Sequence, residues 1–219
     1  MKIGISRIHF PVTTLGPGRR LGIWFQGCSI RCAGCISADT WATGKGILDL
    51  EELLERFDGW LLECDGITIS GGEPFDQSDA LLSLLTRLRA KCAADVLVYS
   101  GHPFECLADV LQRMSGLIDA LITDPYLVHA PQTLPIRGSD NQRLHMLTPL
   151  GRERFATFEN PDGRAQTFDI MFDDDGAIWL AGIPQRGDFE RLKAHLGQLG
   201  HRVLTSEDAS SPLCGADQA

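Results

Sequence analysis

The sequence predicts an α/β protein in which parallel strands form an open, partial β/α barrel, followed by a small β-rich C-terminal extension. Between residues 49 and 124, short apolar runs alternate with helical patterns, a rhythm that favours right-handed crossovers and a parallel sheet. Fewer than eight strand–helix units are present, so we expect the barrel to stay open. After residue 150, short alternating runs separated by turn residues predict a separate β-rich segment.

The composition is that of a globular protein of 219 residues, enough for one domain with an appendage or for two small domains. The formal net charge of −9 argues against nucleic-acid binding through a basic surface. The N-terminus lacks the apolar core of a signal peptide, and no apolar run approaches membrane-spanning length. We therefore expect a cytoplasmic protein that binds neither nucleic acid nor membrane.

The first elements lead to a cysteine-rich loop. Residues 3–13 alternate in part between apolar and polar and predict an opening strand or hairpin. A turn rich in glycine and proline follows at 15–20. The apolar run at 21–27 predicts a buried strand, whose C-terminal end delivers a loop with three cysteines.

Helix and strand signals then alternate along the chain. Leucines at helical spacing after acidic residues predict a helix near 49–57. Pro103 fits the first turn of a later helix. The other elements expected here are strands at 67–69, 96–99, 120–123 and 144–147, and helices at 77–91 and 103–114.

The C-terminal third has a different pattern. Three short alternating runs, near 155–158, 167–172 and 177–180, predict an antiparallel meander with a turn at 173–176. Apolar residues at helical spacing predict a closing helix over 187–200. We thus expect three segments, which are a core domain over 1–150, the meander-and-helix extension over 151–204, and a disordered tail over 205–219.

Four informative segments follow predicted strands. They are the cysteine loop, Gly71-Gly72-Glu73, Ser100-Gly101-His102 and Asp124. Because the carboxyl ends of parallel strands meet at one edge of a sheet, where such folds bind ligands, we expect these segments to converge on one site.

The cysteine loop carries Cys28, Cys32 and Cys35, a spacing that can hold three irons of a cubane cluster. A fourth iron would then lack a protein ligand and be open to a substrate or cofactor. Spacing alone leaves two alternatives. One is a zinc site completed by a distant His or Cys, and the other is an electron-transfer cluster with a fourth cysteine, for which Cys64 is nearest.

The Gly71-Gly72-Glu73 motif favours the cluster with an open fourth iron over these two alternatives. Glycines at a strand end let a ligand approach the backbone closely, and a carboxylate beside them can accept hydrogen bonds from a ligand ammonium group. A glycine pair after a strand is by itself usually a turn. Its combination with the cysteine triad, in this order, is specific.

Cys-x3-Cys-x2-Cys followed by a Gly-Gly-Glu strand end resembles the radical S-adenosylmethionine superfamily. Residues 15–150 are similar in particular to its glycyl-radical-enzyme activases, in the branch of the anaerobic ribonucleotide reductase activating proteins. The shared motifs are Gly16-Pro17-Gly18 with Arg20, Gly27-Cys28, Cys32-x-Gly34-Cys35, Thr40-Trp41, Ser70-Gly71-Gly72-Glu73-Pro74 and Arg137-Gly138-Ser139-x-Asn141-Gln142-Arg143.

The resemblance implies an oxidoreductase in which the three cysteines ligate a [4Fe–4S] cluster and S-adenosylmethionine binds the fourth iron. Reduced flavodoxin or a similar donor would supply an electron to cleave S-adenosylmethionine to a 5′-deoxyadenosyl radical, which would make a glycyl radical on a partner enzyme. The implied cofactor contacts are Gly34, Cys35 and Ile36 for the adenine, and Ser70, Gly71, Gly72 and Glu73 for the methionine.

Further residues are weaker candidates. Trp41, with Trp24, is expected to shield the cluster from water. Ser100 and His102 end one strand, and Asp124 ends another, where each would contact ligand or cap a turn.

The last shared motif contributes Arg137 and Asn141 as candidates. A basic rim that receives an acidic donor or partner is also expected, although each arginine taken singly fits a solvated face. The rim would consist of Arg19, Arg20, Arg137 and Arg143.

Two other functions fit the same residues. One is a radical S-adenosylmethionine enzyme that modifies a peptide, nucleoside or small molecule, and the other is a non-catalytic iron–sulfur module for binding or electron transfer. Two departures from the superfamily keep them open. Gly34 replaces the aromatic residue that often precedes the third cysteine, and the chain extends about 70 residues beyond the short activases.

Overall fold

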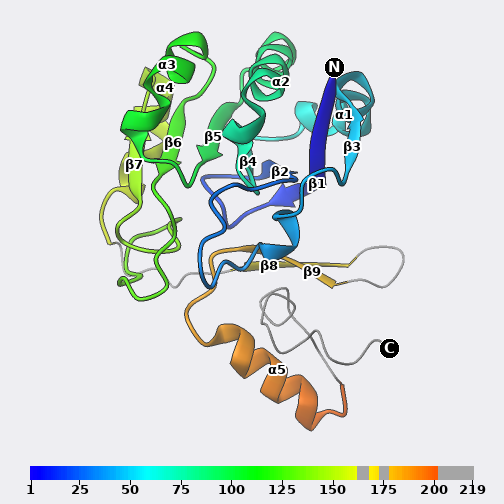
Figure 1. Ribbon diagram of the computed structural model, residues 1–219, viewed down its shortest axis with the longest axis vertical. Helices are drawn as coiled ribbons and strands as arrows, with labels where there is room; N and C mark the ends of the chain where they lie inside the picture. The colour runs from blue at the N-terminus through cyan, green and yellow to red at the C-terminus, as the bar shows by residue number, and fades with distance from the viewer. Residues whose placement is uncertain (162–167, 173–177, 202–219) are drawn as a thin grey trace.

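Seven strands form one open sheet in the computed structural model, which describes residues 1–161, 168–172 and 178–201 (Figure 1). The strand order is β3-β1-β2-β4-β5-β6-β7. The strands are β1 Lys2–Val12, β2 Arg20–Phe25, β3 Ile47–Asp49, β4 Gly66–Gly71, β5 Asp95–Tyr99, β6 Ala120–Thr123 and β7 Arg143–Met146.

The four central strands, β2, β4, β5 and β6, are parallel, and the strands outside them pair antiparallel. The expected open α/β sheet is therefore confirmed. Because the four parallel strands end at the same edge, the loops that follow them are brought together there.

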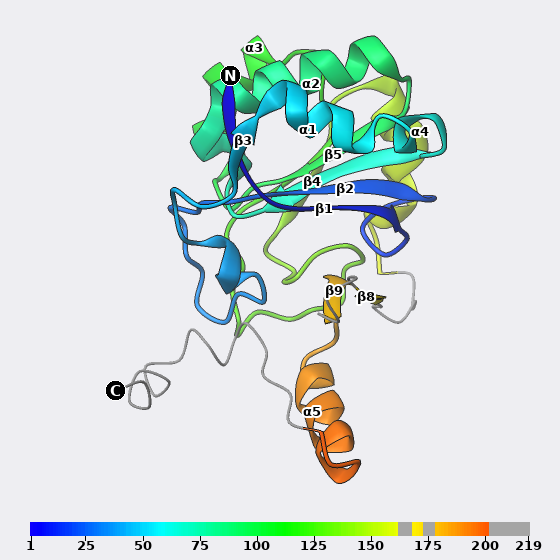
Figure 2. The ribbon, with the colours of Figure 1, turned by 90° about the vertical axis from the view of Figure 1, so that its right-hand side faces the viewer.

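Three helices, α1 to α3, cover one face of the sheet (Figure 2). Leu53, Leu81 and Leu84 are fully buried against strand residues such as Ile69 and Val98, as their helical spacing requires. The helices are α1 Leu50–Phe57, α2 Ser78–Lys91, α3 Ala108–Arg113, α4 Pro149–Phe155 and α5 Asp188–Gln198, with short 3-10 helices at Ala38–Thr40, Trp60–Leu62, Pro74–Gln77, Phe104–Leu107 and Ala156–Phe158. No helix in the described part of the chain has both the length and the apolar character needed to cross a lipid bilayer.

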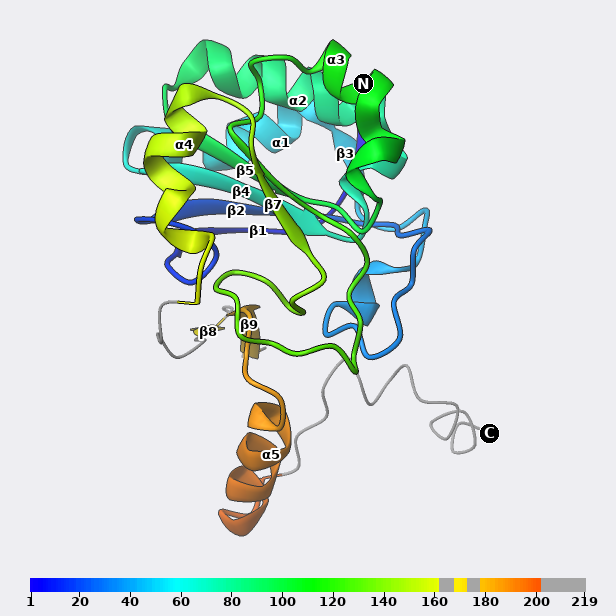
Figure 3. The same cartoon turned by 90° about the vertical axis from the view of Figure 1, so that its left-hand side faces the viewer.

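The opposite face of the sheet is covered by later elements. Phe155, the last residue of α4, is fully buried against Leu97 and Ile122. The small antiparallel hairpin formed by β8 Phe168–Phe172 and β9 Ile178–Gly182 lies below this face, and α5 projects away from the body (Figures 2 and 3). The expected β-rich extension is present.

The strand expected at 155–158 is wrong, because α4 ends there and a 3-10 helix follows. Thr148 Oγ1 accepts a hydrogen bond from Gly151 N at 3.0 Å, and Pro149 occupies the first turn of α4. A helix therefore begins before residue 155 and continues up to it. The meander is thus a two-stranded hairpin, whereas the closing helix is confirmed as α5. The turn at 173–176 and the tail at 205–219 lie outside the described residues.

Candidate functional site

The loops after β2, β4 and β5 line a cavity of about 640 Å³. A cavity of this size is in the range that binds cofactors and small ligands. Asp124, after β6, is not among the lining residues in the described chain. The segments that do meet there include Cys28, Cys32 and Cys35, the strand end Ser70-Gly71-Gly72-Glu73, and Ser100 with Gly101.

The cysteine loop is fixed by hydrogen bonds at its start. Cys28 N donates to Trp41 O at 3.2 Å. Ser29 donates from N and from Oγ to the carboxylate of Asp76, at 2.7 and 2.8 Å. Asp76 lies in the 3-10 helix that follows Glu73, so the strand end holds the loop that it faces. Asp76 is not among the site residues that the sequence predicts, although its place three residues after Glu73 could have indicated that it lies near the site.

The thiols of the triad share one electrostatic environment. Burial raises the pKa of each thiol, that of Cys35 to about 11. N–H groups act in the opposite direction, because they stabilise negative charge on sulfur, and such donors tune metal-bound thiolates. They belong to Arg31 and Ile30 at Cys28, to Tyr126 at Cys32, and to Ser37 and the indole of Trp41 at Cys35.

The donor set fits a cluster better than a single ion. Among the residues that the structure describes, no three His, Cys, Asp or Glu side chains are grouped so as to hold one metal ion. Zinc therefore lacks a complete ligand set in this part of the chain. Three sulfurs around one cavity suit a cubane, whose irons each take a separate ligand. Cys64, the candidate fourth ligand, is not among the lining residues.

The two glycines are required by the packing of the protein's own backbone. Gly71 has a φ of +105°, and a Cβ there would lie 2.4 Å from Phe25 N. A Cβ on Gly72 would lie 2.0 Å from Gly27 O. Gly72 N donates to Phe25 O at 2.9 Å, and Glu73 N donates to Gly27 O at 2.8 Å. The end of β4 thus packs tightly on the end of β2, which carries the cysteine loop.

Gly72→Ala is therefore expected to displace the residue before Cys28 and to lower cluster content about tenfold or more, because a backbone carbonyl cannot rotate away. Iron and sulfide bound after anaerobic reconstitution measure the effect. Gly59→Ala is the control, since nothing lies within 4 Å of a Cβ at that position. Equal cluster content in both variants would show that this packing does not position the loop.

Glu73 joins the ends of β4 and β5. Its side chain is fully buried, and Oε1 accepts from Ser100 Oγ at 3.0 Å and from Phe75 N at 3.1 Å. Oε2 accepts from Gly101 N at 2.7 Å. Burial raises the pKa of Glu73, whereas these donors and nearby His102 lower it. The contact with a methionine ammonium, implied by the resemblance, stays a prediction.

Other predicted residues border the same cavity. Gly34 has a φ of +73°, and a Cβ there would lie 3.0 Å from Val128 Cγ2, so glycine suits both the backbone and the space. Gly138 and Gln142, which belong to the last shared motif but were not singled out, also line it. The predicted residues found on the cavity wall are Gly34, Cys35, Ile36, Trp41, Ser70, Gly71, Gly72, Glu73 and Ser100.

Four predicted residues, His102, Asp124, Arg137 and Asn141, are not among those described as lining the cavity. His102 Nε2 lies 3.7 Å from Asp76 Oδ1, in the 3-10 helix after β4. Asp124 accepts from Arg143 Nε at 2.7 Å, and Asn141 Nδ2 donates to a backbone carbonyl at 2.8 Å. These contacts shape the loops around the site.

The expected basic rim is wrong for three of its four arginines, whereas Arg19 is exposed. Arg20 is fully buried, and Arg137 is buried with its guanidinium donating to backbone carbonyl oxygens. Arg143 pairs with Asp124 and with Glu105, the latter at 2.7 Å. The guanidinium groups of Arg20 and Arg137 thus bind internal acceptors, and that of Arg143 is held in exposed ion pairs, so none of the three is free for a partner.

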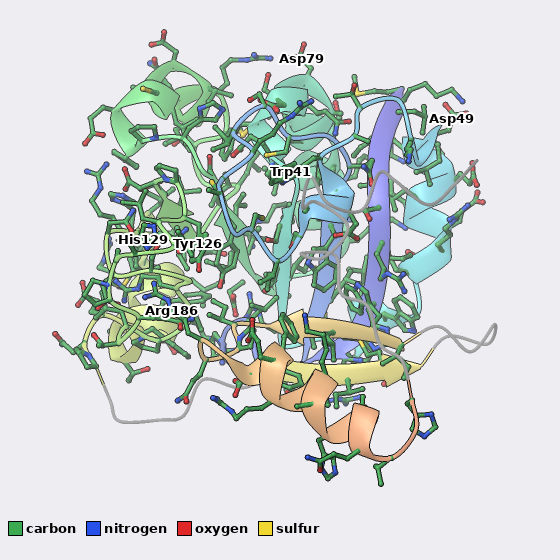
Figure 4. All side chains as sticks on the ribbon, turned by 60° about the horizontal axis from the view of Figure 1, so that its bottom comes forward. Trp41, Asp49, Asp79, Tyr126, His129 and Arg186 are labelled. Carbon is green, nitrogen blue, oxygen red and sulfur yellow. The ribbon has the colours of Figure 1, made fainter. Side chains whose placement is uncertain are left out.

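One wall of the cavity comes from the C-terminal extension. Residues 180–187, Phe189 and Glu190 line it together with Trp24 of β2. Figure 4 shows Arg186 beside the loop that carries Tyr126, and its guanidinium donates to a backbone carbonyl of that loop. These positions carry no motif, so nothing in the sequence predicted their place at the site.

Comparisons with known proteins give a family and several relatives. The model of the 4Fe-4S single cluster domain matches residues 14–145. The anaerobic ribonucleoside-triphosphate reductase-activating protein of Vibrio cholerae serotype O1 is 28% identical over 149 residues, 64% of this chain and 96% of that protein. The pyruvate formate-lyase-activating enzyme of Listeria monocytogenes is 30% identical over 140 residues, 60% of this chain and 55% of that enzyme. Among solved structures, QueE from Escherichia coli matches with a TM-score of 0.40 and 20% identity, over 46% of this chain and 53% of that one.

Proposed function

Because the chain belongs to the family of 4Fe-4S single cluster domains, we propose that Cys28, Cys32 and Cys35 bind one [4Fe–4S] cluster. The observation that carries the proposal is that these thiols and the Gly71-Gly72-Glu73 strand end line one cavity. Three cysteines for four irons leave one coordination position without a protein ligand. We propose that S-adenosylmethionine takes that position.

The residues of this chain hold and orient both groups. When bound, the cluster and S-adenosylmethionine would supply the reductive radical chemistry that removes a hydrogen atom from a substrate. Residues 34–36 border the cavity on the side of the cysteine loop, and Gly72 does so at the end of β4, where the adenine and methionine are proposed to lie. Trp24 and Trp41 contribute large apolar surfaces that keep water out.

The proposed substrate is a partner enzyme on which a glycyl radical is made. Both relatives described above are named as activating proteins, one for an anaerobic reductase and one for pyruvate formate-lyase. The electron would come from reduced flavodoxin or a similar donor in the cytoplasm. The six cysteines described are all free thiols, which is compatible with a reducing compartment.

A second candidate is direct radical modification of a peptide, nucleoside or small molecule. The observation that favours it is the wall from the extension, because the family model ends at residue 145. A non-catalytic iron–sulfur module is the remaining alternative, and it differs from both enzymes in forming no 5′-deoxyadenosine.

Anaerobic reconstitution with iron, sulfide, a reductant and S-adenosylmethionine tests the chemistry. The expected product is 5′-deoxyadenosine, and its absence from a protein with a full cluster would contradict both enzymatic proposals. A glycyl-radical protein encoded in a neighbouring reading frame would be the partner to test next. A stoichiometric glycyl radical in it, observed by electron paramagnetic resonance, would decide for activation.

Cluster assembly is expected to improve as the pH rises from about 7 to about 9. Burial raises the pKa of Cys28, Cys32 and Cys35 above 9.0, and each thiol must lose its proton to bind iron. Protons therefore compete with iron more strongly at the lower pH. Cluster yield at limiting iron and sulfide, followed by visible absorbance, measures this. A yield that does not change with pH would show that the thiols are already ionised in the cluster-free protein.

A further inference from the structure

The C-terminal extension is bound to the segment after β1 by a set of exposed and partly buried polar contacts. Asp169 of β8 accepts hydrogen bonds from Thr13 N and Thr13 Oγ1, both at 2.7 Å, and from Thr14 Oγ1 at 3.0 Å. Thr14 Oγ1 also lies 3.1 Å from Ala181 O of β9. One carboxylate therefore ties the hairpin to the segment that follows β1.

Aromatic contacts hold the same hairpin over β2. Trp179 packs edge-on against Trp24, with ring centroids 4.5 Å apart, and the Arg7 guanidinium lies 4.8 Å from the Trp179 ring centroid. Met171 and Ala181 are buried in the same cluster. The hairpin thus shares a small core with the face of the sheet opposite α1 to α3 (Figures 2 and 3).

Two further contacts hold the segment after β9 against the loop after β6. Gln132 Nε2 donates to Pro184 O at 2.9 Å, and the Arg186 guanidinium donates to Ala130 O. The segment between β9 and α5 is therefore held by two hydrogen bonds to the loop after β6. These contacts fix its position at the cavity.

This wall is an addition to the shared core. The family model ends at residue 145, and the Vibrio cholerae relative is covered over 96% of its own length by 64% of this chain. Residues 180–187, 189 and 190 lie beyond the family match, yet they border the cavity that the cysteine triad also lines. What they add is a surface for a molecule other than the cluster.

The charge of the cavity limits what that molecule is. Among the described residues that line it, Arg186 is the one cation, and it already donates to Ala130 O. Glu73 is satisfied by its own hydrogen bonds, which leaves Glu190 as the other charged group. A phosphate-bearing ligand is usually held by several cationic side chains, and the described residues that line the cavity offer Arg186 alone.

We propose that residues 180–190 select the substrate, with Phe189 and Glu190 as specificity-determining residues. The inference rests on the proposed function and specifies the substrate's chemistry. A stretch of polypeptide, the substrate class of the proposed function, would meet on this wall the ring of Phe189, the carboxylate of Glu190 and the side-chain amide of Gln185. The core that matches the family, residues 14–145, would then carry out the reaction, and the extension would determine which substrate binds at the cavity.

The test uses the full-length, cluster-loaded protein with reductant and S-adenosylmethionine. The probe is a capped pentapeptide whose central glycine carries deuterium at Cα, and adenosine triphosphate is the phosphate-bearing competitor. Mass spectrometry gives the fraction of 5′-deoxyadenosine that contains deuterium, together with its total amount. In the transfer, the Cα–D bond breaks, a C–D bond forms at the 5′ carbon, and Cα keeps the unpaired electron.

Phe189→Ala and Glu190→Ala are each expected to lower the deuterated fraction about tenfold or more. Glu190 is exposed, so its variant separates substrate contact from folding. His195→Ala, an exposed change on the same helix away from the cavity, should keep the wild-type fraction.

Equal fractions in all variants would overturn the inference. So would the absence of deuterium transfer while 5′-deoxyadenosine still forms, or inhibition by adenosine triphosphate as strong as by unlabelled peptide. A wild-type protein that forms no 5′-deoxyadenosine would instead overturn the proposed function.

Discussion

Replacing Cys32 by alanine is expected to abolish cluster binding and, with it, cleavage of S-adenosylmethionine. The proposed cluster has three protein sulfurs, and all three line the same cavity. Removing one would leave two irons without a protein ligand, and the described residues that line the cavity include no cysteine besides these three. Iron content and visible absorbance should fall to background, and no 5′-deoxyadenosine should form.

Two cysteine variants are the matched controls. Cys106→Ala changes an exposed residue in the 3-10 helix Phe104–Leu107, and Cys64→Ala removes the nearest candidate for a fourth ligand. Both should keep wild-type cluster content. Intact cluster absorbance in Cys32→Ala would mean that the ligand assignment is wrong, whereas its loss in Cys64→Ala would favour a four-cysteine electron-transfer cluster.

The parallel core could be predicted because local and tertiary signals agree there. The leucines of α1 and α2 follow the helical period, and the same residues are buried against the sheet. Short apolar strands end in glycine or polar residues, which topology then collects at one edge. For this reason the sequence predicts that the cysteine triad and the Gly71-Gly72-Glu73 motif lie at one site.

The secondary structure of the extension was harder to predict, because short apolar runs occur in both strands and helices. The short run with Phe155, Thr157 and Phe158 was compatible with a strand, yet Thr148 caps a helix and Phe155 packs on the sheet against Leu97 and Ile122. Burial in the core outweighed the local pattern. The wall formed by residues 180–190 could not be predicted, since it depends on contacts such as Asp169 with Thr13, far apart in the chain.

Several roles were misread because the partner is distant in sequence. Arg20 was assigned to a surface rim, but its carboxylate partner Asp95 lies 75 residues away. For Glu73 the structure adds hydrogen bonds that its oxygens accept from residues 75, 100 and 101, and its expected contact with a ligand stays a prediction. A charged residue's sequence neighbours do not reveal whether it is buried.

The Arg20 network lies at the edge of the sheet opposite the cavity, because Arg20 and Asp95 are the first residues of β2 and β5. Both side chains are 0% exposed, with Arg20 Nη2 2.6 Å from Asp95 Oδ1. Arg154 Nε donates to Asp95 Oδ2 at 3.0 Å. The other N–H groups of Arg20 donate to Thr68 Oγ1, Pro17 O and Ile67 O. A pair satisfied in this way is tolerated, but removal of one partner leaves a buried, uncompensated charge.

Asp95→Asn is therefore expected to lower the free energy of unfolding by about 3–5 kcal/mol, a large part of the about 5–15 kcal/mol typical of a domain. Asp79→Asn breaks the exposed pair with Arg113 (2.6 Å) and should cost less than about 1 kcal/mol. Urea unfolding of the cluster-free protein measures both values. Since the network lies at the opposite strand ends from the cavity, folded Asp95→Asn should still bind a full cluster. Similar small losses in both variants, or cluster loss at unchanged stability, would contradict this separation of stability from the site.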